Sequence, residues 1–260
     1  MTAPAPRLSA HSLKEFDRCE RKFALRYAQH AFWPGTPPEV EEERGALALG
    51  EAFHLLVQVH ALGLDVTPML GALPDADGRL TALWSAFKGS SHALPTAGER
   101  RWTEQALNLF VGGIPTFVRY DRLVERDGKW TILDWKTGRV KPEALASDWQ
   151  TRLYRFALVA AGEHLGAGPI APEQVTIVYW EVSSGKPLPF AYSQAQYEAD
   201  GRELAARAAH LQHPFNPKLE DDPHYPANRG HCKRCDYYSL CNRVEADLAA
   251  PGAIRAPTFL

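Results

Sequence analysis

The chain has 260 residues, of which 45% are hydrophobic, and a formal net charge of −2. This length allows one large domain or two small ones, and the composition is that of a globular protein with a sizeable core. The near-neutral charge excludes binding to a polyanion through net charge alone, so any nucleic-acid contact must come from local patches. The N-terminal MTAPAPRL lacks the apolar core of a signal peptide, and no apolar run is long enough to cross a membrane. We therefore expect a cytoplasmic protein without a membrane partner.

The first predicted element is a helix over residues 13–30, for which Ser9 and Ser12 are candidate N-terminal caps. Its basic side chains either contact phosphates or form a solvated face, and the sequence leaves both alternatives open. They are Lys14, Arg18, Arg21, Lys22 and Arg26. A breaker rich in proline follows at residues 33–38.

A second helix with a broad apolar surface is predicted over residues 41–63. It contains His54, and a histidine on an apolar helix is, by itself, more often a core residue than a metal ligand. Residues 65–98 are broken by proline, glycine and serine around a short predicted helix at residues 80–87. We interpret this stretch as a peripheral insertion.

The centre of the sequence, residues 116–138, has the pattern of a β-hairpin. Two runs rich in β-branched and aromatic residues flank Asp127 and Gly128, a strong turn signal. Counting outward places Asp121 opposite Asp134, where like charges destabilise a sheet unless a cation lies between them or one carboxyl is protonated. Strand period two puts Lys136 on the same face as Asp134. Two acids, a lysine and a divalent metal would form a catalytic site; the alternative is a surface hairpin whose charges face water.

Further strands are predicted at residues 101–111, 173–182 and 188–192. The first contains Glu104, which is either an additional acid or, more commonly, a solvated strand residue. A capping signal at Ser193 opens a helix to about residue 213. Because the sequence contains no internal repeat or low-complexity linker, we expect one domain over residues 1–260. Its parts are an N-terminal segment (8–30), a core (41–213) and a cysteine segment (228–243).

A helix is also predicted after the hairpin, over residues 148–161, with Ser147 as its cap. Gln150 and Tyr154 are four residues apart and share one face of this helix. Two arginines flank that face: Arg152 and Arg155. The face is either a positively charged surface for hydrogen bonding and stacking, or the buried side of an ordinary amphipathic helix.

Four cysteines stand near the two ends of the chain: Cys19, Cys232, Cys235 and Cys241. A reducing compartment argues against two structural disulfides. The last three have the spacing C-x2-C-x5-C in a polar, basic setting that is unlike a core segment. Four thiolates suit zinc or an iron–sulfur cluster. Unrelated buried thiols are the alternative.

In their order along the chain, four motifs resemble the RecB-like branch of the PD-(D/E)XK nucleases. They are Gly50-x3-His54, Asp121, Asp134-Trp135-Lys136-Thr137-Gly138 and Gln150-x3-Tyr154. One cysteine before the first motif and three after the last helix resemble the iron–sulfur members of that branch, which include the AddB nuclease module and the CRISPR-associated RecB-like exonucleases. The resemblance spans residues 8–243.

The resemblance implies an α/β fold with a restriction-endonuclease-like core, in which helices flank a central mixed sheet. It implies that a 4Fe-4S cluster ties the N- and C-terminal segments together, with zinc at the same cysteines as the alternative. It also implies that His54 is a metal ligand and not a core residue. Together with Asp121, Asp134 and the main-chain carbonyl of Trp135, His54 would hold Mg²⁺ or Mn²⁺.

By the same resemblance, Asp121, Asp134 and Lys136 are the catalytic residues, and Lys136 acts on the attacking water or on the transition state. The residues that would contact DNA are Gln150, Tyr154, Arg152 and Arg155.

The implied activity is metal-dependent DNA hydrolysis, in exonuclease mode on single strands or free ends, in repair, recombination or related processing. The resemblance implies a helicase or another DNA-processing protein as partner. The sequence contains no G-x4-GK[ST] phosphate loop, so any ATP-driven unwinding would come from another protein. Two alternatives stay open: a catalytically silent module that binds DNA ends, and a zinc-stabilised interaction protein.

Overall fold

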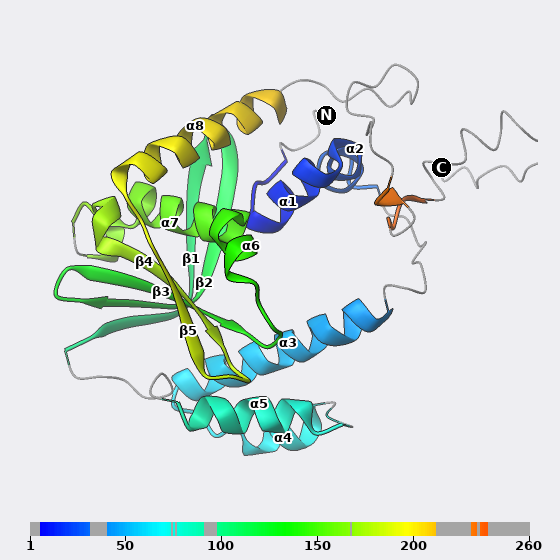
Figure 1. The fold of residues 1–260 in the computed structure, drawn as a ribbon, viewed down its shortest axis with the longest axis vertical. Coiled ribbons are helices and arrows are strands. Elements are labelled where there is room, and N and C mark those ends of the chain that lie inside the picture. The colour runs from blue at the N-terminus through cyan, green and yellow to red at the C-terminus, as the bar shows by residue number, and fades with distance from the viewer. Residues whose placement is uncertain are drawn as a thin grey trace, which may run out of the picture.

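A five-stranded sheet in the order β1-β2-β3-β4-β5 forms the centre of the molecule (Figure 1). The computed structural model describes residues 6–31, 41–73, 75, 77–90, 98–166, 168–211, 230–232 and 235–238, with only the main chain for 41–44. The strands are β1 (Arg100–Val111), β2 (Ile114–Arg126), β3 (Lys129–Lys136), β4 (Val175–Glu181) and β5 (Lys186–Ala191). β3 and β4 are parallel and the other neighbours are antiparallel, which confirms the predicted mixed sheet.

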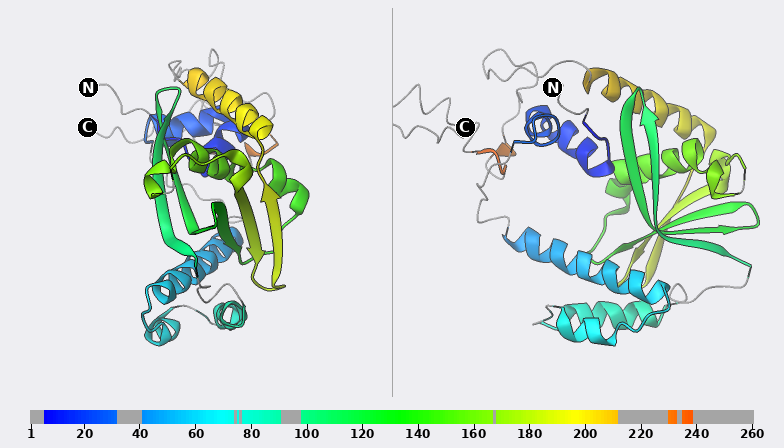
Figure 2. Two further views of the ribbon diagram at one scale, coloured as in Figure 1. Left: turned by 90° about the vertical axis from the view of Figure 1, so that its left-hand side faces the viewer. Right: turned by 180° about the vertical axis from the view of Figure 1, so that it is seen from behind.

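Helices pack on both faces of this sheet (Figure 2). One face carries α1 (Ala10–Arg18), α7 (Trp149–Ala161) and α8 (Gln194–Leu211), and the other carries α3 (Glu41–Ala61) and α5 (Arg79–Lys88). The shorter elements are α2 (Glu20–Phe23), the π-helix η1 (Ala24–Ala28), α4 (Thr67–Ala72), α6 (Pro142–Ser147), and the 3-10 turns η3 (Glu163–Leu165) and η4 (Pro172–Gln174). None of the described helices is long and apolar enough to cross a membrane.

The β2–β3 hairpin forms around the predicted turn. Asp127 and Gly128 both have positive φ, 52° and 73°, as a two-residue type I′ turn requires. The paired residues are Arg126 with Lys129, Glu125 with Trp130, Val124 with Thr131, Leu123 with Ile132, and Arg122 with Leu133. This is the register counted from the sequence. The pairing ends at Arg122 and Leu133, one step before the predicted pair of Asp121 and Asp134.

The stretch after α3, which the sequence predicts to be a peripheral insertion, builds one of the two cores instead. α5 buries Leu80, Trp84 and Phe87 against α3 and the sheet. The ring of Phe87 lies 5.9 Å from that of Trp135. The three α5 side chains are spaced i, i+4, i+7, which is an apolar stripe of a helix that covers a core. The prediction is wrong because proline and glycine around a helix say nothing about the face that it buries.

The N-terminal helix begins earlier than predicted and breaks at Cys19. Ser9 caps α1 in a reciprocal capping box with Ser12. α1 ends at Arg18, because the backbone of Cys19 is extended, with φ of −162°. The Cys19 side chain then caps α2, where Sγ accepts a hydrogen bond from Lys22 N at 3.4 Å. The single continuous helix predicted here is therefore wrong.

α7 begins at Trp149 and its cap is Asp148 rather than the predicted Ser147. Asp148 Oδ1 accepts a hydrogen bond from Gln150 N at 2.7 Å. Ser147 ends α6, a helix that the sequence did not predict. The Asp148 cap puts Gln150 in the first turn of α7.

The cysteine segment, residues 230–232 and 235–238, packs beside α2 and η1, although nearly the whole chain separates them (Figure 1). Cys235 and Tyr237 form a small apolar cluster with Leu25. Tyr237 Oη donates a hydrogen bond to the carbonyl of Ala31 at 2.8 Å. The two segments that the sequence predicts to be tied together thus lie side by side.

Candidate active site

Asp134, Lys136 and Gln150 contact one another where β3 ends and α7 begins. Asp134 is only 3% exposed. Its Oδ1 accepts a hydrogen bond from Gln150 Nε2 at 2.5 Å, and its Oδ2 lies 2.7 Å from Lys136 Nζ. Gln150 Oε1 accepts a hydrogen bond from Lys136 Nζ at 2.8 Å. Because the Gln150 amide contacts both groups, it fixes the acid and the ammonium relative to each other.

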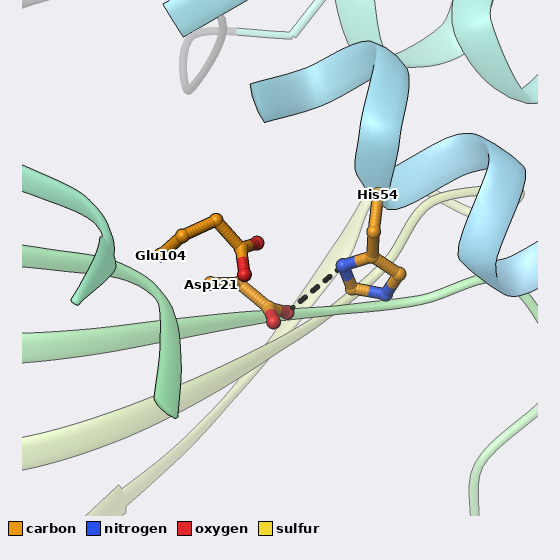
Figure 3. A group of neighbouring side chains, drawn as sticks. All are labelled: His54, Glu104 and Asp121. Atoms are coloured by element: carbon orange, nitrogen blue, oxygen red, sulfur yellow. Dashed lines mark ion pairs between the residues drawn. The ribbon is translucent and has the colours of Figure 1, made fainter. Parts of the chain in front are cut away.

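Asp121 and His54 form the second part of the site (Figure 3). Asp121 Oδ2 accepts a hydrogen bond from Trp135 N at 3.1 Å and lies 3.3 Å from His54 Nδ1. Burial lowers the pKa of His54, so the ring is neutral near pH 7 and offers a lone pair. Burial, and then the charge of Asp134, raise the pKa of Asp121 well above its ordinary value. A second carboxylate is therefore costly here unless a cation joins it.

Glu104 of β1 makes a group of three potential ligands with His54 and Asp121. One ligand atom from each side chain lies within 4.8 Å of the others. The backbone of Glu104 has φ of 51°, which is uncommon outside glycine, and residues held in this way cluster at functional sites. Burial raises the pKa of Glu104, and the nearby charge of Arg119 opposes that shift. The sequence favours a solvated strand residue at this position, and the structure corrects that interpretation.

The regular sheet is interrupted where these acids lie. The β1–β2 pairing skips Glu104 and Asp121, which are opposite each other by count. Residues three apart on a regular strand face opposite sides, yet Tyr120 and Leu123 pack in the same core. The alternation of β2 therefore changes phase beside Asp121. This change lets the Asp121 carboxylate meet His54, which comes from α3 on the other face of the sheet.

Tyr154 supports Gln150 from behind. Its hydroxyl hydrogen-bonds the Gln150 side chain, and burial raises its pKa, so it stays protonated. The rings of Tyr154 and Tyr120 meet edge to face at 5.3 Å. Tyr120 Oη also donates a hydrogen bond to the Tyr154 carbonyl at 3.0 Å. Gln150 and Tyr154, predicted to contact DNA, are thus brought together with the acids and orient them.

An open cleft of about 650 Å³ lies over these side chains. Arg119 and Arg139 line it and supply positive charge beside the carboxylates. Exposed Leu47 and Leu55 of α3 add apolar surface to the same cleft. Neither arginine was predicted from the sequence, although each lies within three residues of a predicted site residue, Asp121 or Lys136.

The floor of the cleft fits a hard divalent cation. Asp134 Oδ2 is buried and has no hydrogen bond among the described residues. Lys136 Nζ lies 2.7 Å from this oxygen and forms an ion pair with it. Carboxylate oxygens beside a neutral imidazole suit Mn²⁺ and Mg²⁺. A cation would also offset the repulsion between Asp121 and Asp134.

Comparison with known proteins identifies the family. The family model of the PD-(D/E)XK nuclease superfamily matches residues 7–242. The chain belongs to this superfamily. A protein from Eubacterium rectale, described as a candidate exonuclease, shares the fold with a TM-score of 0.51 at 10% identity, covering 98% of this chain and 91% of that one. The crystal structure of SSO0001 covers 77% of this chain and 97% of its own at 17% identity, with a TM-score of 0.34. No curated protein sequence gives a significant match.

The two arginines that the sequence assigns to DNA are engaged elsewhere in this PD-(D/E)XK protein. Arg155 is 3% exposed and its guanidinium donates to main-chain carbonyls, including that of Ala191 at 2.6 Å. It therefore has no accessible charge for DNA, contrary to the prediction. Arg152 is paired with Asp200 at 2.6 Å and with Glu203 at 2.9 Å. A phosphate would have to compete with both acids for it.

The cysteines of the PD-(D/E)XK chain are in part outside the described residues. Cys19 and Cys235 are buried and Cys232 is half-buried, while Cys241 is not described. The sulfur atoms of the three described cysteines do not form a group that lies within 4.8 Å. The predicted cluster is therefore not shown, and it stays a prediction.

Proposed function

We propose that this chain is a divalent-metal-dependent deoxyribonuclease that hydrolyses phosphodiester bonds from DNA ends. The observation that carries the proposal is the convergence of Asp121, Asp134 and Lys136 beside His54 at an open cleft. Membership of a nuclease superfamily supports phosphodiester hydrolysis. The exonuclease mode rests on the RecB-like order of motifs and on the Eubacterium rectale protein described as a candidate exonuclease.

The proposed ion ligands are His54, Asp121, Asp134 and the main-chain carbonyl of Trp135. When bound, Mg²⁺ or Mn²⁺ lowers the pKa of a bound water and neutralises charge on the scissile phosphate. The chain prepares this set in advance, because Trp135 N donates to Asp121 Oδ2 and the His54 ring lies 3.3 Å from that oxygen. These two contacts hold His54, Asp121 and the Trp135 peptide together, and Asp134 lines the same cleft one residue before Trp135.

Lys136 is proposed to orient the attacking water or to stabilise the pentavalent phosphorane. Its ammonium is held by Asp134 and Gln150 and lies 4.9 Å from the ring centre of Tyr179. A cation fixed in this way needs little reorganisation when charge develops on the phosphate. Gln150 positions Lys136, and Tyr154 positions Gln150.

The proposed substrate is single-stranded DNA or DNA with free ends, in repair, recombination or a related process. A helicase or another DNA-processing protein would supply such DNA. The local positive charge for phosphate binding comes from Arg119 and Arg139 at the cleft, in place of the arginines inferred from the sequence.

The test is digestion of end-labelled single- and double-stranded DNA with Mn²⁺, and with a chelator in its place. We expect the wild-type protein to shorten DNA from its ends only with Mn²⁺, and Asp134→Asn to abolish this. Asp127→Asn makes the same chemical change in the turn of the same hairpin and should leave cleavage intact. Binding without cleavage by the wild-type protein would favour the silent DNA-end-binding module, and cleavage by Asp134→Asn would refute the assigned site.

We also propose that Cys19, Cys232, Cys235 and Cys241 hold a 4Fe-4S cluster. The packing of Cys235 against Leu25, close in sequence to Cys19, supports the shared site. Zinc is the alternative, since it also takes four thiolates. Purification without oxygen, followed by iron, sulfide and zinc analysis, separates the two. A colourless protein with one zinc per chain would contradict the cluster and leave the nuclease proposal standing.

A further inference from the structure

Glu104 and Arg119 form an ion pair inside the cleft. Arg119 Nε lies 3.1 Å from Glu104 Oε2, and both residues line the cleft. The two side chains differ in their freedom: 63% of the Arg119 side chain is exposed, but only 18% of the Glu104 side chain. The carboxylate is thus held in place, whereas the guanidinium can move into the cleft without leaving a packed position.

The Glu104 carboxylate has a second set of neighbours. It lies within 4.8 Å of ligand atoms of His54 and Asp121 (Figure 3). An interrupted stretch of the β1–β2 pairing and a φ of 51° aim the side chain there, which regular strand geometry would not do. One carboxylate cannot serve a guanidinium and a metal ion at full strength at the same time. Its two sets of neighbours therefore compete.

We propose that Glu104 is a further ligand of the divalent ion and that Arg119 is its counter-ion only in the metal-free protein. When the ion binds, the Glu104 carboxylate binds the ion in place of Arg119, and the Arg119 guanidinium becomes free to contact a DNA phosphate in the cleft. Arg119 is well placed for this exchange, two residues before Asp121 on β2. The inference rests on the proposed nuclease function and adds a coupling to it. Because such coupling is reciprocal, DNA also strengthens ion binding by the same factor.

The exchange predicts opposite effects of two substitutions on the same ion affinity. Glu104→Gln keeps the shape of the side chain but removes a ligand charge, so it weakens Mn²⁺ binding. Arg119→Ala removes the cation that competes for Glu104, so it strengthens Mn²⁺ binding in the absence of DNA. An ion pair that only stabilises the sheet would lower the melting temperature in both variants and change neither ion affinity.

The experiment measures Mn²⁺ binding to the full chain by isothermal titration calorimetry without DNA. We expect Glu104→Gln to weaken the affinity by about tenfold or more, as loss of a group that supports a metal site does, and Arg119→Ala to strengthen it severalfold. Arg119→Lys, which keeps the charge, is the matched control and should stay close to the wild-type value. In Glu104→Gln/Arg119→Ala the gain from Arg119→Ala should vanish, because no charge is left to compete for.

DNA binding gives the second half of the test. Fluorescence anisotropy measures the DNA affinity of Arg119→Ala and of the wild-type protein, once with Ca²⁺ and once with a chelator. The DNA is checked for integrity after each titration. The loss of DNA affinity in Arg119→Ala should be larger with the ion than without it. An equal loss in both conditions would overturn the exchange.

Two further outcomes would overturn the inference: a Glu104→Gln affinity for Mn²⁺ equal to that of the wild-type protein, or weaker Mn²⁺ binding by Arg119→Ala. If Glu104→Gln does not fold, as its melting curve would show, the direction of the Arg119→Ala effect decides alone. A wild-type protein that binds Mn²⁺ and DNA but cleaves nothing refutes the proposed function, whereas the calorimetric comparison still tests the inference.

Discussion

Two regions are held together in different ways: the hairpin site, formed by Asp134, Lys136 and Gln150, and the junction of the two chain ends. In the hairpin site, Asp134 is contacted by Lys136 on its own strand and by Gln150 on the next long helix. These contacts follow from one turn, one strand register and one helix cap, all local in sequence. The site therefore needs no crosslink to assemble.

The junction between η1 and the cysteine segment joins residues separated by nearly the whole chain. Its described polar contacts include the hydrogen bond from Tyr237 to the Ala31 carbonyl and an ion pair of Lys22 with Asp236 at 3.7 Å. Such contacts are individually small, and partly exposed ion pairs contribute little. The difference indicates that a metal crosslink at the cysteines would contribute most to stability at the junction and least to the hairpin site.

The substitution with the largest expected effect disrupts the junction and leaves the hairpin site intact. In the chain-entropy model, a crosslink that closes so long a loop stabilises by at most about 5 kcal/mol. Cys19→Ala should remove iron and sulfide and lower the melting temperature far more than an ordinary buried Cys→Ala change. Any protein that stays folded should retain Mn²⁺-dependent cleavage. Loss of cleavage from folded Cys19→Ala would show that the two regions are not independent.

The substitution with the next largest expected effect disrupts the hairpin site and leaves the junction intact. Lys136→Ala should lower turnover by about 10²–10³-fold, as loss of one preorganised group that stabilises a transition state does. Mn²⁺ affinity should not fall, because the ammonium is paired with Asp134 and competes with the ion instead of binding it, and iron content should stay near the wild-type value. Lys129→Ala, at the exposed turn of the same hairpin, is the control. If Lys136→Ala only weakens Mn²⁺ binding, the assigned role is wrong.

A smaller effect concerns the charge balance of the metal-free site. Because the pKa of Asp121 is raised in the folded protein, the folded state binds more protons than the unfolded state above the ordinary aspartate pKa of about 3.9. Stability contributed by Asp121 is therefore present at low pH and lost as pH rises through the raised pKa. With a chelator, Asp121→Asn should melt higher than the wild-type protein at neutral pH, and this advantage should shrink toward acid pH. Melting curves across pH check both, and an advantage independent of pH would contradict the explanation.

The smallest expected effect concerns the stability that the junction gains from its own non-covalent contacts. Tyr237→Phe removes the hydrogen bond to the Ala31 carbonyl and should cost on the order of 1 kcal/mol of unfolding free energy. Tyr238→Phe, at an exposed neighbouring position, is the matched control. Denaturant unfolding of both variants gives the difference. A loss as large as that of Cys19→Ala would mean that the junction is held by its own contacts.

The sequence by itself determined the hairpin that carries Asp121, Asp134 and Lys136. A turn of two residues with positive φ and the period of two along a strand are local properties, so the register could be counted before any tertiary structure was known. The Ser9 cap was predictable for the same reason. The pairing of two acids across that register already indicated a cation.

Only the tertiary structure decided which other side chains reach those acids. His54 acquires its contact with Asp121 because α3 packs across the sheet and β2 changes phase there, and neither event is visible in a single strand. Glu104 joins the site through the same interruption. The helical period places Gln150, Tyr154 and the arginines on or near one face of α7. The neighbouring strands determine how much of α7 is buried, and Arg155 lies within the buried part. A side chain's role depended on long-range packing wherever its partner came from another element.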